Sequence, residues 1–393
     1  MAFAINPLVD RVLEPPTAET RSWVASGAYN RDLPLIDASQ AVPNYPPAQE
    51  LMEHLAEAAL EPETAFYTPI LGIEPLREAL AADLSRGYGA AIDAGNVAIT
   101  NGGNHAFCMA LLALAAPGDE VILPSPFYFN HQMWFEMQGI AARSLPCRET
   151  AEGLVPEVEE AEALIGERTR AIVLVSPNNP TGTIYSAARL KGFYDLARRH
   201  GLALVVDETY KDFLPDGGAP HDLFREHDWQ DVFVLLYSFS KVYSLTGYRV
   251  GALAGGDRFM AAIGKIADTL TICPPHIGQR AALYGLTHLR DWTEDKRADL
   301  LERQGVLRAA FSSHAPPFRL ISCGAFFAYI DHPFGDRPSL DVARQLLADA
   351  SLVTWPGSFF GPDQDRYIRL AFANARDDEI EEIVWRLTLI AAE

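Results

Sequence analysis

The sequence predicts an α/β fold, with a large domain built on a mostly parallel sheet between helices and a second, smaller α+β domain. Two observations support this prediction. Short apolar runs alternate with helical segments between about residues 97 and 254, which is the pattern of parallel strands covered on both faces. Beyond residue 254, three helical segments follow one another before strand and helix alternate again, which indicates a change of domain.

The N-terminal region precedes this alternation. Its first 45 residues are rich in proline and predict a loop-like arm that lies over another surface. Apolar residues at helical spacing then predict helices at 47–60 and 75–86. Pro75 occupies the first turn of the second helix and Gly87 ends it.

Apolar runs and turn residues define the elements of the large domain. Gly201 suits the end of the helix at 187–200, because glycine readily adopts the left-handed conformation that terminates helices. The predicted strands lie at 97–100, 120–123, 171–175, 202–206 and 232–236. The predicted helices lie at 103–114, directly after residue 128, and at 187–200.

The C-terminal third has a different order of elements. The predicted segments are helices at 257–268, 276–289 and 293–313, a strand at 325–330, a helix at 339–350, a strand at 367–372 and a helix at 377–391. We expect residues 1–45 to form an arm and part of the small domain, residues 46–288 the large domain, and residues 289–393 the small domain.

Composition and charge narrow the range of functions. The chain has 393 residues, of which 49% are apolar and 21% charged, as in soluble globular proteins. Its 52 acidic residues outnumber 32 basic ones and give a net charge of −20, which argues against nucleic acid or an anionic membrane as a partner. The four cysteines show no CxxC pair or metal-ligand spacing, so we expect reduced thiols and no metal site. The sequence shows no signal-peptide pattern and no apolar stretch of about 18 residues, so a cytoplasmic location is expected.

Lys241 is the most informative single residue. It follows the apolar run 232–237, stands among hydroxyl side chains, and has no acidic residue within several positions. A lysine held in such surroundings can lose its proton and act as an amine nucleophile. On this stretch alone a structural lysine remains the commoner case, so the rest of the chain has to decide.

Other unusual residues follow the predicted strands, where ligands bind in open parallel sheets. The glycine-rich turn 100–105 leaves backbone N–H groups free to hold a phosphate at the start of a helix. Aromatic rings follow the next strand at 125–129, and the turn 176–182 carries two asparagines that can face a cleft. Asp207 directly follows five apolar residues, and burial of its carboxylate requires a cation or hydrogen-bond donors.

Together these residues fit pyridoxal phosphate (PLP). Lys241 supplies an amine for its aldehyde, and Asp207 supplies an anion that keeps its ring nitrogen protonated. The cofactor also needs donors to its ring hydroxyl, a phosphate site and an aromatic ring to stack on. These needs are met by Asn179 and Tyr210, by the glycine turn with Ser238 and Arg249, and by Tyr128.

Four motifs occur in order along the chain. They are Ser-Pro-Asn-Asn-Pro-Thr-Gly at 176–182, Val-Val-Asp-Glu-Thr-Tyr at 205–210, Ser-Phe-Ser-Lys with Thr-Gly-Tyr-Arg-Val-Gly at 238–251, and Tyr-Ile-Arg-Leu-Ala-Phe at 367–372. Their order and separations resemble those of the class I/II aminotransferases, which are fold-type I PLP enzymes. The resemblance extends from about residue 35 to the C-terminus. It implies an aspartate aminotransferase-like fold, whose PLP-binding domain has a sheet of the seven-stranded type.

The resemblance also implies roles for individual residues. Lys241 would form a Schiff base with the cofactor and act as the base in a ping-pong amino transfer from an L-amino acid to a 2-oxo acid, with Asp207 and Tyr210 as further catalytic residues. Arg369 would hold the substrate carboxylate, beside Asn179 and Ala41. Tyr67 would reach the phosphate of a neighbouring subunit, which implies a homodimer with shared active sites. The implied cofactor-binding residues are Gly102, Gly103, Asn104, Tyr128, Asn179, Asp207, Tyr210, Ser238, Lys241, Arg249 and Tyr67.

The sequence departs from the family pattern at several positions. Ala41 stands where glycine is usual, and its methyl group narrows the room beside the substrate carboxylate. Tyr128 and Tyr248 stand where tryptophan is frequent, and no motif supplies a second arginine that faces the substrate. His105 and Arg280 lie near the expected pocket edges, where a structural role is the commoner one.

Two other functions are compatible with the same cofactor. Elimination, racemisation or oxidation of an amino acid would need Lys241 and Asp207 equally, because the cofactor ring takes up electrons in each of these reactions. A non-catalytic PLP-sensing domain of a transcription regulator is the third hypothesis. It is disfavoured because about 35 residues precede the matched region, too few for a winged helix, and because the net charge opposes DNA binding.

Overall fold

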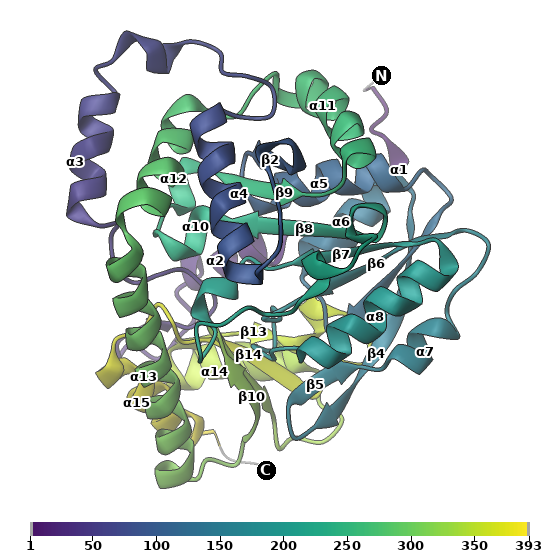
Figure 1. Cartoon of the computed structure of the whole chain (residues 1–393). Coiled ribbons are helices and arrows are strands. Elements are labelled where there is room, and N and C mark those ends of the chain that lie inside the picture. Colours follow the sequence, from purple (N-terminus) through teal and green to yellow (C-terminus); the bar gives the residue numbers. More distant parts are fainter. Residues whose placement is uncertain (1–2, 391–393) are drawn as a thin grey trace.

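A computed structural model describes residues 3–390 of the chain. The larger domain is built on an eight-stranded sheet with the strand order β2-β9-β8-β7-β6-β3-β4-β5 (Figure 1). Four neighbouring pairs, from β8 through β7, β6 and β3 to β4, run parallel. The strands are β2 (Val97–Thr100), β3 (Glu120–Ser125), β4 (Ala141–Thr150), β5 (Gly153–Pro156), β6 (Thr169–Val175), β7 (Ala203–Asp207), β8 (Phe233–Ser238) and β9 (Gly251–Ala254). The predicted mostly parallel sheet is therefore confirmed, and the antiparallel edge strand β5 adds an eighth strand to the seven-stranded type.

Alternate residues of the central strands enter two different cores. Leu204 and Val206 of β7 belong to one cluster of buried residues, whereas Val205 between them belongs to another. Successive side chains of a strand point to opposite faces, so the two clusters lie on the two faces of the sheet. Helices α4 (Glu74–Tyr88), α8 (Ala187–His200) and α12 (His276–His288) contribute to the first cluster. Helices α5 (Gly103–Leu114), α6 (Phe129–Gln138) and α11 (Asp257–Thr271) contribute to the second.

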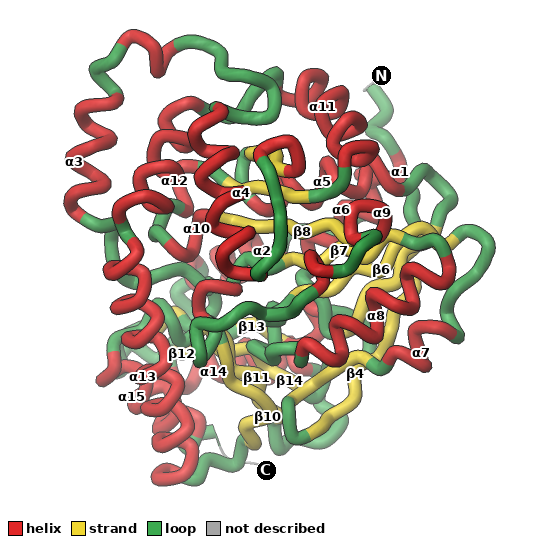
Figure 2. The backbone as a smooth tube through the Cα atoms, in the orientation of Figure 1, coloured by secondary structure: helices red, strands yellow, loops and turns green. Residues whose placement is uncertain are grey.

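The smaller domain contains a four-stranded antiparallel sheet with the order β10-β11-β14-β13. A strand from the N-terminal region, β1 (Ile36–Asp37), pairs in parallel with β12 (Leu352–Val353) of this domain. The remaining elements are β10 (Arg319–Gly324), β11 (Phe327–Asp331), β13 (Trp355–Pro356), β14 (Tyr367–Ala371), α13 (Arg290–His314), α14 (Ser339–Ala350) and α15 (Asp377–Leu387). The separation of helices and strands into these two parts is visible in Figure 2. The domain limits near residues 45 and 289 stay predictions.

Helices also occur where the sequence predicted a loop-like arm. The N-terminal region forms α1 (Pro7–Asp10) and α2 (Pro16–Ala25) before it reaches β1. Both helices begin with a proline, whose fixed φ suits the first position of a helix and whose missing N–H is not needed there. The prediction of a loop-like arm therefore missed these two helices, although much of the rest of residues 3–45 lies outside helices and strands. A third N-terminal helix, α3 (Gln49–Ala58), lies within the predicted range 47–60.

Several boundaries differ from the predictions. Helix α4 continues through Gly87, and Gly89 ends it with a φ of 61°. Strands β4, β5 and β9 were not predicted. β4 mixes polar and apolar residues and is partly exposed, so it lacks the apolar run of a central strand, and β9 is a short strand of mostly small residues. The helix predicted at 377–391 ends at Leu387, and residue 391 lies outside the described residues. Within residues 3–390, no helix has both the length and the apolar character that crossing a membrane requires.

The turn after β6 touches the smaller domain at Gly182. This residue has a φ of +72°, and a Cβ built there would overlap the carbonyl oxygen of Gly324. Gly182→Ala should therefore lower the free energy of unfolding by about 2–4 kcal/mol, from left-handed strain and from overlap. Urea unfolding measures the change. The control is Gly305→Ala at an exposed position of helix α13, where a Cβ meets nothing. This change should raise the free energy of unfolding by about 0.5–1 kcal/mol. An unchanged unfolding midpoint for Gly182→Ala would contradict the close packing of this turn.

Candidate active site

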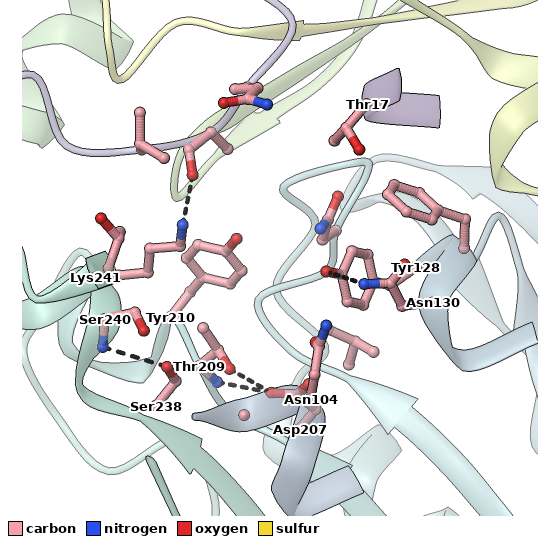
Figure 3. Close-up of a pocket in the computed structure, with 18 of the residues that line it drawn as sticks. Thr17, Asn104, Tyr128, Asn130, Asp207, Thr209, Tyr210, Ser238, Ser240 and Lys241 are labelled. Carbon is pink, nitrogen blue, oxygen red and sulfur yellow. Dashed lines mark hydrogen bonds between the residues drawn. The ribbon is translucent and has the colours of Figure 1, made fainter. Parts of the chain in front are cut away.

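A cavity of about 500 Å³ lies where the central strands of the large sheet end. Its wall includes the last residues of β6, β7 and β8, the first turns of α5 and α6, and residues of β13 and β14 from the smaller domain. Figure 3 shows the side chains that converge on it. The site residues predicted from the sequence that line this cavity are Ala41, Gly103, Asn104, Tyr128, Asn179, Asp207, Tyr210, Ser238, Lys241, Arg249 and Arg369.

Lys241 lies in the short helix α10 (Phe239–Val242), directly after β8. Its Nζ donates a hydrogen bond to the backbone oxygen of Ala41 at 2.6 Å (Figure 3). Burial, and then the positive charges of Arg369 and Arg249, lower the pKa of Lys241 to about 8. A neutral fraction of this amine is therefore present near physiological pH, far larger than for an ordinary lysine with a pKa of about 10.4, as a nucleophile or a base requires.

Asp207 ends β7 and is 8% exposed. Its Oδ1 accepts hydrogen bonds from the backbone N of Thr209 at 3.0 Å and from the Thr209 hydroxyl at 2.7 Å. Its Oδ2 lies 3.7 Å from Nε2 of His131. Burial raises the pKa of Asp207, and the Thr209 hydrogen bonds counteract this. A buried carboxylate of this kind can stabilise a protonated nitrogen in the cavity.

His131 was missed by the sequence analysis. Its ring stacks on Phe107 with 3.8 Å between the ring centroids, and burial lowers its pKa to about 3. It is therefore a neutral neighbour that packs behind Asp207. A single histidine within α6, a helix of mixed polar and apolar residues, carries no sequence signal that separates this position from an ordinary core residue.

The start of α5 offers hydrogen-bond donors that suit an anion. Gly102 precedes the helix with a φ of 89°, and the first N–H groups of a helix point outward without partners in the helix. Gly102 itself lies behind the cavity wall, where a Cβ would overlap the guanidinium of Arg249. Ser238 and Arg249 line the cavity at this point. The glycine turn therefore lets a guanidinium approach the helix N-terminus, which provides the donors that a phosphate group binds.

Arg369 is a buried cation, only 1% exposed. Its Nη1 donates to Asn179 Oδ1 at 2.9 Å, its Nη2 donates to the backbone oxygen of Ser39, and its guanidinium carbon lies 4.1 Å from the ring centre of Trp355. Within residues 3–390 its Nε has no hydrogen-bond partner. Burial lowers its pKa to about 9. A buried guanidinium that still has a free donor is suited to bind a carboxylate.

Two tyrosines complete the wall. Tyr128 accepts a hydrogen bond from Asn130 Nδ2 at 2.8 Å, and the ring of Tyr210 packs edge-on against Phe327. Burial raises the pKa of both Tyr128 and Tyr210, so both phenols keep their protons at neutral pH and can donate hydrogen bonds.

Some predicted residues lie elsewhere. Tyr67 is 79% exposed and does not line the cavity of its own chain. Arg280 forms an ion pair with Glu61 at 2.6 Å, and Nδ1 of His105 accepts a hydrogen bond from the backbone N of Asn101. Cavity residues that the sequence analysis missed are Pro15, Thr17, Gln40, Val42, Phe129, Asn130, Val175, Thr209, Ser240, Thr246 and Trp355. The only signal for the first two was the expectation that the N-terminal region lies over another surface.

Residues 34–387 match the sequence model of the family described as aminotransferase class I and II. The chain belongs to this family. Its relatives include the aromatic aminotransferase ISS1 of Arabidopsis thaliana, with 28% identity over 95% of this chain and 92% of the relative. A probable aspartate/prephenate aminotransferase of Thermus aquaticus is 30% identical over 83% of this chain and 85% of the relative.

Solved structures of aminotransferases share the whole fold. Substrate-bound BacF of Bacillus subtilis has a TM-score of 0.89 and 26% identity, and 98% of each chain is covered. Aspartate aminotransferase of Thermus thermophilus with maleate has a TM-score of 0.87 and 25% identity, with 98% of this chain and 99% of that chain covered. This chain is therefore an aminotransferase, which transfers an amino group between an amino acid and a 2-oxo acid. The comparisons do not favour the elimination, racemisation, oxidation or regulatory functions considered from the sequence.

The lowered pKa of Lys241 predicts how this amine reacts in the cofactor-free protein. Acylation of Lys241, followed by quantitative mass spectrometry, should reach half its maximal rate near pH 8, whereas an ordinary lysine does so at about 10.4. Arg369→Gln should move this midpoint upward, because it removes a nearby positive charge. The unfolded chain holds this proton more tightly, so Lys241 contributes stability that increases as the pH rises from about 8 towards 10.4. A midpoint near 10 in the folded protein would contradict the proposed environment.

Proposed function

We propose that this aminotransferase binds PLP in the cavity and converts L-amino acids and 2-oxo acids by a ping-pong route that depends on Lys241. One observation carries the proposal. A lysine amine with a pKa of about 8 shares the cavity with a buried arginine that has a free donor and with a buried carboxylate. These three groups are an amine, a carboxylate-binding group and an anion for a ring nitrogen.

The residues present fit PLP along its whole length. The N-terminus of α5, with Ser238 and Arg249, provides donors for the phosphate. Asp207 provides the anion that pairs with the pyridinium nitrogen. Asn179 and Tyr210 provide donors for the ring hydroxyl, and Tyr128 provides a ring for stacking. When bound, the cofactor supplies an aldehyde for the substrate amine and a ring that takes up the electron pair released at the substrate Cα.

Lys241 and Arg369 act on different groups of the substrate. Arg369 binds the α-carboxylate, with Nη1 oriented by Asn179 and the guanidinium plane held against Trp355. Lys241 Nζ removes the proton from the substrate Cα, and its lowered pKa keeps a neutral amine available for this step. The Ala41 carbonyl oxygen accepts a hydrogen bond from Nζ and so helps to fix the position of the amine in the cavity. We propose Lys241, Asp207 and Tyr210 as the catalytic residues.

We further propose a homodimer with shared active sites in a cytoplasmic protein. Tyr67 belongs to a segment that extends from α3 along the outer edge of the molecule (Figure 1). This segment carries large exposed apolar side chains, and neighbouring ones lie at the end of α11: Met52, Leu60, Phe66, Tyr67, Ile70, Leu270 and Ile272. Exposed apolar surface of this kind is typical of a subunit interface. An isologous interface would place Tyr67 of each chain at the phosphate site of the other.

Amino transfer is tested by its half-reaction. Purified protein with bound cofactor should convert from the aldehyde form to the amine form when mixed with suitable L-amino acids, as followed by absorbance. Lys241→Ala should slow this conversion by about 10²–10⁴-fold, the usual contribution of a positioned base. Lys265→Ala, an exposed lysine of α11, is the control and should react like the native protein. If no amino acid of varied charge and size converts the cofactor, the proposed function fails.

Shared sites are tested by mixing two impaired variants. Tyr67→Ala should weaken cofactor binding and so lower activity at limiting PLP, and Lys241→Ala should remove nearly all turnover. In a mixed dimer of the two chains, one site combines Lys241 of one chain with Tyr67 of the other, so coexpression should restore activity. Coexpression of Lys241→Ala with Arg369→Met is the control. These two residues line the cavity of the same chain, so no intact site forms in that mixture. Absence of any gain with the Tyr67 variant would exclude its role across the interface.

A further inference from the structure

The ionisable groups of the cavity are few. Among the described residues that line it, the cations are Lys241, Arg249 and Arg369, and the carboxylate is Asp207. In the proposed function all four already have partners, namely the cofactor and the α-carboxylate of the substrate. The wall that one chain leaves for the substrate side chain therefore has no lysine, arginine, histidine or carboxylate within residues 3–390.

Three neutral polar side chains that line the cavity have no role in the proposed cofactor site and come from the N-terminal region or the start of α6. They are Thr17, Gln40 and Asn130. Within residues 3–390, the Thr17 hydroxyl and the Gln40 amide form no side-chain hydrogen bond, and Asn130 uses its Nδ2 to donate to Tyr128. Thr17 and Asn130 lie across the cavity from Lys241 (Figure 3). Val42, Phe129 and Pro15 provide apolar surface beside these groups.

Thr17 is held at the cavity by the smaller domain. It lies in the first turn of α2, whose Trp23 packs against Phe359 with 6.2 Å between ring centroids. The Arg344 guanidinium lies over the Trp23 ring at 5.4 Å and pairs with Glu19 at 3.5 Å. The hydroxyl therefore belongs to a packed helix and has a defined position in the wall.

Resting on the proposed function, we infer that this aminotransferase selects amino acids whose side chain is neutral and forms hydrogen bonds, such as an amide or a hydroxyl, over amino acids with an acidic side chain. A carboxylate in this part of the cavity would lose water without gaining a cation, which is costly. A wholly apolar side chain would leave the polar groups of Thr17 and Gln40 without partners, and a site with unpaired polar groups rejects such analogues.

Isosteric donor pairs test this inference with the native holoenzyme. Glutamine and glutamate differ in charge but hardly in shape, as do asparagine and aspartate. Stopped-flow measurement of the half-reaction should give a kcat/KM at least about tenfold higher for the amide of each pair. Equal or faster reaction of the acidic member, or reaction with neither member, would overturn the inference. The first outcome would leave the proposed amino transfer intact, whereas failure of every amino acid, alanine included, would remove both.

Substitutions in the neutral wall test which residues select the side chain. Thr17→Val and Gln40→Met keep the size of the side chain but remove its hydrogen bonds. Each should lower the ratio of kcat/KM for glutamine to kcat/KM for alanine by about 5–50-fold. Ser22→Ala, on the exposed side of the same helix α2, is the matched control and should leave the ratio unchanged. An unchanged glutamine-to-alanine ratio in both wall variants would assign the selection to other residues and overturn their role.

Discussion

The burial of Arg369 is the constraint on which the site depends. Its guanidinium is almost completely removed from water and has no carboxylate partner within residues 3–390. Three segments share the task of holding it: β14 carries it, the turn after β6 provides Asn179, and the chain before Ala41 provides the Ser39 carbonyl oxygen. Aromatic rings of Trp355, Phe327 and Phe360 surround it. A cation held by neutral acceptors and ring faces is incompletely stabilised, so an anion that enters the cavity supplies the negative charge that the fold does not provide.

This constraint also explains the environment of Lys241. The same positive charge that attracts a carboxylate disfavours the lysine ammonium, together with burial and Arg249. The protein as a whole carries a net charge of −20, yet three cations and one carboxylate from the described residues line the cavity. A local positive field inside an acidic protein is suited to small anions such as a phosphate ester or an amino acid carboxylate. The acidic exterior opposes larger polyanions.

The sequence predicted the parts that local pattern controls. Central strands such as β6 and β7 are continuous apolar runs and could be found from the sequence. The same holds for Lys241, Asp207 and Arg369, which belong to motifs beside or within such runs. The edge hairpin β4–β5 could not be found, because a half-exposed strand has no apolar run. Trp355 and Thr17 were missed for a different reason. Each reaches the cavity from an element distant in the sequence, and only packing in three dimensions brings such residues together. His131, which packs behind Asp207, has no local pattern that separates it from an ordinary core residue.

The position of Thr17 and Gln40 has an evolutionary consequence. The proposed catalytic groups come from the strand ends of the large sheet, whereas much of the wall proposed to recognise the side chain comes from the first 42 residues. Two different stretches of the gene would then encode reactivity and substrate choice. Mutations in the N-terminal stretch can redirect the enzyme towards new amino acids while the strand ends stay under separate selection. In a lineage with this arrangement, the range of amino acids accepted can change while the catalytic residues stay the same.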